Sequence, residues 1–148
     1  MADYLLFRDI AKAMAVGDGD RAAELIGNID DAEMHEYHTY ITAVFAAAVA
    51  HYFKDDSSPE AIRRFVDGMR HDYRKANPPL QALTMEGLLR AFFGEEHLMD
   101  EIDPNEQLRC EFLAIRKMVF DNDELRLGLD KLVADAEAMA REWLTDAT

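Results

Sequence analysis

The sequence predicts an all-α fold: one compact domain spanning residues 1–148, with six to seven helices packed around a central buried helix at about residues 31–54. The chain has only four prolines and seven glycines, and most of them lie where a helix is expected to begin or end. Apolar residues recur at helical spacing in nearly every segment. No stretch alternates between apolar and polar residues over a strand length, so the pattern predicts no β-strand.

The first two helices are predicted to form an antiparallel hairpin. Leu6, Ile10 and Met14 have helical spacing between residues 3 and 16, and Gly17 ends this helix. Asp20 is expected to cap a second helix that ends near Gly27. Two short helices joined by so few residues are expected to pack against each other.

The central helix begins, in this interpretation, at a variant capping box formed by Asp30 and Glu33. It contains HEYHTYITAVFAAAVAHYF, residues 35–53, which is apolar on nearly all sides. A membrane span needs about 20 apolar residues, and the apolar centre, residues 41–50, is about half that length. The pattern therefore predicts the middle helix of a bundle and not a membrane span.

Three more helices follow, each with its own start or stop signal. Ser58 and Pro59 begin one helix, and the Asn77–Pro78–Pro79 stretch is expected to end it. Gly94 closes the next, and the acidic EEHLMDEI stretch after it is expected to be one more helical turn or an ordered loop. Asp103, with proline next and Glu106 in the first turn, is the strongest start signal in the chain.

The last helix is predicted from about residue 123 to residue 144. Its main apolar seam has the spacing of helix-on-helix packing and consists of Leu125, Leu129, Leu132, Ala136, Met139 and Trp143. Val133, Ala140 and Leu144 form a second, narrower face, and Leu127 projects in a third direction. Extra apolar surface needs a cover, and a symmetric homodimer is the commonest way to supply one. The alternative is that the N-terminal hairpin of the same subunit covers this face.

The charge limits the classes of partner. The formal net charge is −14, from 30 acidic and 16 basic residues, which disfavours nucleic acids and anionic membranes. The first residues carry Asp3, Arg8 and Asp9 and lack the apolar core of a signal peptide, so a cytoplasmic location is expected. The single cysteine, Cys110, excludes an intramolecular disulfide and is expected to be structural.

Asp31, His35 and His38 are the candidate metal ligands. They are spaced i, i+4 and i+7, so an unbroken helix places them on one stripe, and two imidazoles with a carboxylate can bind zinc or ferrous iron. Thr39 stands where the second histidine of an HExxH motif belongs, and no Glu-x-x-His pair occurs. Ordinary boundary histidines are the preferred interpretation, and no metal or other cofactor is expected.

Two functions remain open. The first is a non-enzymatic interaction or regulatory module that binds another protein, or itself, through helix faces. It is supported by uneven charge: residues 57–79 carry five basic and three acidic residues, whereas residues 95–106 carry six acidic ones. The alternative is a small-molecule-binding protein or enzyme with a pocket between helices, lined by Tyr40, His51, Phe92 and Phe93. An interaction module predicts a filled interior around His51.

The stretches VGDGDRAAELI, SPEAIRRFVDGMRHDY and ALTMEGLLRAFFG together resemble small helical actinobacterial proteins of uncharacterised function. The resemblance covers the first two-thirds of the chain. It implies an all-helical fold and supplies no catalytic residue.

Overall fold

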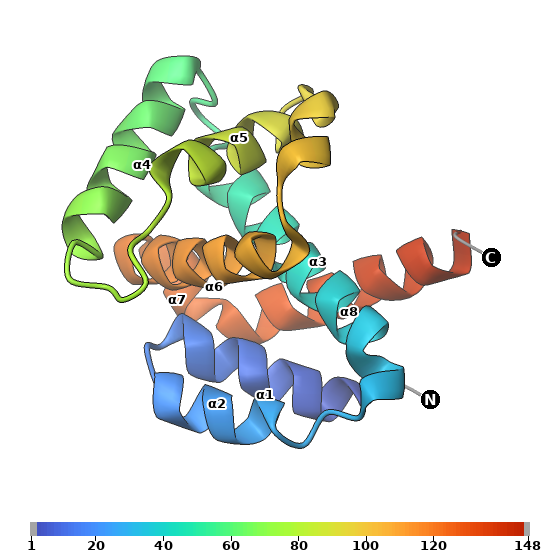
Figure 1. Ribbon diagram of the computed structural model, residues 1–148. Helices are drawn as coiled ribbons and strands as arrows, with labels where there is room; N and C mark the ends of the chain where they lie inside the picture. The colour runs from blue at the N-terminus through green and yellow to red at the C-terminus, as the bar shows by residue number, and fades with distance from the viewer. Residues whose placement is uncertain (1–2, 147–148) are drawn as a thin grey trace.

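The computed structural model describes residues 3–146, and the regular structure in that range is entirely helical (Figure 1), which confirms the all-α prediction. It contains eight α-helices and two short 3₁₀ helices. Their bounds are α1 Tyr4–Ala15, α2 Gly19–Ile26, η1 Asp31–Glu33, α3 Met34–Tyr52, α4 Pro59–Asp72, α5 Ala82–Phe92, η2 Glu96–Glu101, α6 Pro104–Asp121, α7 Asp123–Leu127 and α8 Leu129–Asp146.

Helix α3 runs through the middle of the molecule, with α6 on one side and α8 crossing on another (Figure 1). Nine of its 19 residues are buried. A helix that is apolar on nearly all sides is most stable where other helices surround it and exclude water from every side. The predicted central helix therefore occupies the predicted place.

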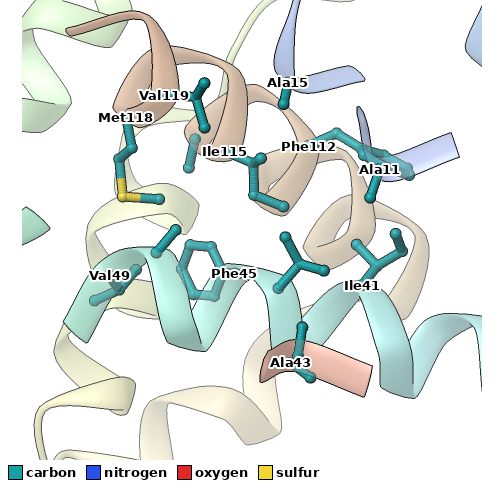
Figure 2. Close-up of a cluster of buried hydrophobic side chains, with 14 of the residues drawn as sticks. Ala11, Ala15, Ile41, Ala43, Phe45, Val49, Phe112, Ile115, Met118 and Val119 are labelled. Atoms are coloured by element: carbon teal, nitrogen blue, oxygen red, sulfur yellow. The ribbon is translucent and has the colours of Figure 1, made fainter. Parts of the chain in front are cut away.

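The core between α3 and α6 is built from large side chains that point toward each other (Figure 2). Phe45 and Val49 come from α3, and Ile115 and Met118 come from α6; all four are buried. Ala43 points the other way, toward α8 (Figure 2). Small residues at that contact let two helix backbones approach closely, since the separation of packed helices depends on the side chains between them.

The C-terminal region differs from its prediction. Instead of one helix from 123 to 144, α7 ends at Leu127 and α8 begins at Leu129. The break lies at Gly128, where an added Cβ would be 2.9 Å from the carbonyl oxygen of Glu124. Glycine accommodates this close approach without a shift of the backbone, and after the break α8 crosses α3.

The start of α3 also differs from its prediction. Asp30 makes no side-chain capping bond, and residues 31–33 form the 3₁₀ helix η1. The Glu33 carboxylate instead accepts a hydrogen bond from the backbone N–H of Asp3 at 3.0 Å. The predicted capping box is therefore wrong: a contact with the start of α1 replaces the local one.

Other boundary predictions have mixed outcomes. Ser58 and Asp103 cap α4 and α6 as predicted, each accepting from backbone N–H groups of the first turn. Asp18, and not Asp20, caps α2. Helix α4 ends at Asp72, before the prolines, and the hydroxyl of its C-cap residue Tyr73 donates to the Leu113 carbonyl of α6 at 3.0 Å.

Within residues 3–146, none of the helices combines the length and the apolar character needed to cross a bilayer.

Candidate functional site

Glu111 is the most unusual residue of the molecule. Of the charged and polar residues that the structure describes, it alone is buried, with 1% of its surface exposed. It lies on α6, on the same side as the core residues Ile115 and Met118, which follow it at helical spacing. Burying a carboxylate costs free energy unless other groups replace its hydration. Groups around Glu111 must therefore replace the water that a carboxylate would otherwise bind.

Neutral donors surround this carboxylate. The Thr42 hydroxyl of α3 lies 3.1 Å from both carboxylate oxygens, and the Gln107 side-chain amide donates to Oε2 at 3.1 Å. Among the described residues no lysine, arginine or histidine forms an ion pair with it. Burial raises the pKa of Glu111 to about 7, although the hydrogen bonds from Gln107 and Thr42 partly oppose the shift.

Glu111 lies where two small cavities adjoin. Both cavities are lined by the same four residues, Thr42, Gln107, Glu111 and Trp143. We call the two together the Glu111 cleft. The cleft lies between α3, α6 and the last turns of α8, and α5 and η2 line its far end.

The two halves of the cleft differ in chemistry. The polar half has a volume of about 230 Å³ and is lined further by His35, His38, Thr39, Pro104 and Leu108. The apolar half has a volume of about 210 Å³ and is lined further by Phe45, Ala46, Leu88, Ala91, Phe92 and Met99. A carboxylate thus lies between a polar half and an apolar half of one solvent-open cleft, and apolar walls with a few polar groups are the usual composition of a small-molecule site.

The four residues predicted to line a pocket are not brought together. Phe92 lines the apolar half of the Glu111 cleft. Tyr40 is buried in the core, where its hydroxyl donates to the Val133 carbonyl at 3.3 Å. Phe93 packs against Phe53, with ring centroids 5.8 Å apart. Only one of the four therefore belongs to the cleft.

His51 borders a different hollow, an open groove of about 550 Å³ between α3 and α8. Its Nε2 lies 3.3 Å from the Glu124 carboxylate but is not oriented to form a hydrogen bond with it. Lys54, Lys131 and Asp135 also line this groove, so both signs of charge face solvent there. His51 thus borders a solvent-open groove at the surface and not an interior cavity.

The candidate metal ligands are also separated. Asp31 lies in η1, outside the α-helix, because the predicted capping box does not form. His35 and His38 both line the polar half of the cleft. In the part of the chain that the structure describes, no three histidine, cysteine, aspartate or glutamate side chains converge as metal ligands would.

The predicted interface residues divide in two. Val133 is 3% exposed and Ala140 is fully buried, whereas Leu144 is half-buried and Leu127 is 85% exposed. Contacts with α1 cover this face of α8: Arg8 pairs with Glu137 at 3.0 Å, and Arg141 lies 4.3 Å above the Tyr4 ring. Val133 and Ala140 are therefore buried within the subunit, and α1 contacts the same helix through Arg8 and Tyr4.

Sequence reasoning missed the central group of the cleft, although a signal was present. Leu108, Glu111, Ile115 and Met118 are spaced i, i+3, i+7 and i+10, so helical periodicity places an acid in the middle of an apolar face. The contributions of Thr42 and Gln107 had no comparable signal. Thr42 is separated from Glu111 by 69 positions, and only the packing of α3 on α6 brings them together.

Comparison of the chain with protein-family models, curated proteins and solved structures finds no significant match.

Proposed function

We propose that this protein binds a small organic molecule in the Glu111 cleft. The observation that carries the proposal is a buried carboxylate that lines two adjoining cavities without a cationic partner. A carboxylate placed this way weakens the fold, since protonation or a counter-charge would relieve its desolvation. Ionisable groups with strongly shifted pKa values in clefts are typical of functional sites.

Binding is better supported than catalysis. The residues that line the cleft include no cysteine, serine or lysine to act as a nucleophile. The adjacent thiol, Cys110, is buried, and burial raises its pKa to about 12, so it is not a reactive thiolate. The cleft thus lacks the serine, cysteine and lysine side chains that most often form covalent intermediates, which favours ligand recognition over covalent catalysis.

An NMR screen of small fragments of mixed charge tests the proposal. Fragments that bind should shift the amide signals of Thr42, Gln107 and Glu111 together. Ala91→Leu fills the apolar half of the cleft and should abolish these shifts. Ala61→Leu, the same substitution at a similarly buried alanine outside the cleft, is the matched control and should leave them unchanged. Fragments that shift only residues of the His51 groove would contradict the proposal.

A protein-interaction role, the first expectation from the sequence, has a separate observation in its favour. Phe120 at the end of α6 is 76% exposed and Leu127 at the end of α7 is 85% exposed. The Arg126 guanidinium donates to the Phe120 carbonyl at 2.9 Å, which holds these two helix ends together. Sedimentation at micromolar concentration tests whether this surface pairs two copies. A dimer that Leu127→Glu converts to a folded monomer would support the interaction role. A monomer at every concentration would show that the protein does not act by pairing with itself.

A further inference from the structure

The charge of Glu111 is the first constraint on the ligand. The two side chains that donate to Glu111, the Thr42 hydroxyl and the Gln107 amide, are neutral. The lining of both halves of the cleft contains no lysine or arginine. A carboxylate can accept about four hydrogen bonds, so it has room for a further donor. A negative ligand group would meet an unbalanced negative charge, in a chain whose net charge is already −14.

The shape of the cleft is the second constraint. The apolar half has a volume of about 210 Å³ and is bordered by Phe45, Leu88, Phe92 and Met99. A ligand that reaches Glu111 can therefore place an apolar body in this half. Its volume is below the range typical of drug-sized sites, so the ligand is small.

Trp143 is the third constraint, since it lines both halves beside Glu111. The face of an indole ring attracts cations more strongly than the other aromatic side chains do. A carboxylate and an indole that border the same space form a common arrangement for recognising an organic ammonium group.

We infer that the ligand of the Glu111 cleft is a small organic cation, a protonated amine with its ammonium group on Glu111 and its apolar body among Phe45, Leu88 and Phe92. This inference rests on the proposed function and names its ligand class. The ammonium donates to the carboxylate, and no covalent step takes place.

Binding of a cation to Glu111 should depend on pH. The titratable groups that face Glu111 are His35 and His38, both from α3; the lining residues from α5, η2 and α8 do not titrate. A cation binds the ionised carboxylate, so binding draws the proton off Glu111. With a pKa of about 7, affinity should rise about tenfold between pH 6 and pH 8. The His35→Gln/His38→Gln variant should retain most of the effect, because Glu111 is the group that bonds the cation.

Three probes of the same shape and different charge provide the test: phenethylamine, 2-phenylethanol and 3-phenylpropionate. Trp143 is the only tryptophan of the chain, so its fluorescence reports directly on the cleft. Calorimetry of the full chain at pH 8 gives the affinities independently. We expect phenethylamine to bind about tenfold or more tightly than the alcohol, since the ammonium adds attraction between opposite charges to the hydrogen bond that either probe can donate. We expect no binding of the carboxylate.

Glu111→Gln should remove the preference for the amine over the alcohol. Glu106→Gln removes a carboxylate from the same helix outside the cleft and should retain the preference. Alcohol or carboxylate binding as tight as amine binding would overturn the cationic ligand and leave a ligand-binding cleft in place. Equal amine affinity in the Glu111→Gln variant, or no saturable response to the amine at millimolar concentration, would also overturn it. The fragment screen then decides separately whether the cleft binds any small molecule.

Discussion

The hydroxyl of Thr42 lies 3.1 Å from both carboxylate oxygens of Glu111, across the interface of α3 and α6. This contact joins the central helix to the one buried acid among the described residues. It also places the acid at the boundary of two cavities. The pH dependence of folding and the chemistry of the cleft therefore depend on the same group.

Glu111→Gln should stabilise the protein above neutral pH. The pKa of Glu111 is raised from an ordinary 4.5 to about 7, so the folded state binds more protons than the unfolded state between these values. The stability contributed by this group is therefore fully present below pH 4.5 and is lost as pH rises through 7. Removing the charge should raise the free energy of unfolding by about 3 kcal/mol at pH 8 and have little effect at pH 4.

Urea denaturation of both proteins across this pH range measures the difference. Glu106→Gln is the control, because that carboxylate is only partly buried, and its effect should vary little with pH. A Glu111→Gln effect that is the same at pH 4 and pH 8 would contradict the assigned ionisation.

Val133→Glu should unfold the subunit and not release a folded monomer. Val133 is 3% exposed, and its carbonyl accepts the buried Tyr40 hydroxyl. Placing a charge there should cost about 3 kcal/mol or more. Leu127→Glu is the matched control at an 85% exposed position and should change stability by less than about 0.5 kcal/mol. Thermal unfolding followed by circular dichroism compares the two, and a folded Val133→Glu protein would show that this face is not covered.

Gly128→Ala should destabilise the junction of α7 and α8. The added Cβ would lie 2.9 Å from the Glu124 carbonyl oxygen, which is backbone and cannot move without shifting the turn. We expect a loss of about 1–2 kcal/mol in the free energy of unfolding by urea. Gly87→Ala provides the contrast, because nothing lies within 4 Å of its added Cβ inside α5. That substitution should stabilise by about 0.5–1 kcal/mol, and two substitutions of the same sign would refute the steric explanation.

Asp103→Ala should destabilise α6, whereas Asp30→Ala should not affect α3. Asp103 accepts from the backbone N–H groups of Asn105 and Glu106 at 3.1 and 3.2 Å, and loss of such a cap costs about 1 kcal/mol. Asp30 makes no side-chain capping bond. Urea denaturation should therefore separate two aspartates that look alike in sequence. Equal losses would mean that Asp30 caps α3 after all.

The helical class and most of the helix positions could be predicted from the sequence. Apolar periodicity, Ser58 and Asp103 as caps, and the position of Gly17 after the first helix all act within a few residues, so the local chain contains the whole interaction. The apolar stretch of α3 also predicted its central place, since few positions other than the middle of a bundle can bury a helix on every side.

Which side chains contact each other could not be predicted from the sequence, because these contacts depend on how the helices pack. Local signals could not show that Glu33 would bond to the backbone of Asp3, or that Val133 and Ala140 would be buried within the subunit. The cleft could not be predicted from local signals for the same reason. Its acid is visible on the apolar face of α6, but its burial, its partner Thr42 and its shifted pKa depend on how α3, α5, α6 and α8 cross. Exposure and electrostatic environment are set by residues far apart in sequence, and only packing brings these together.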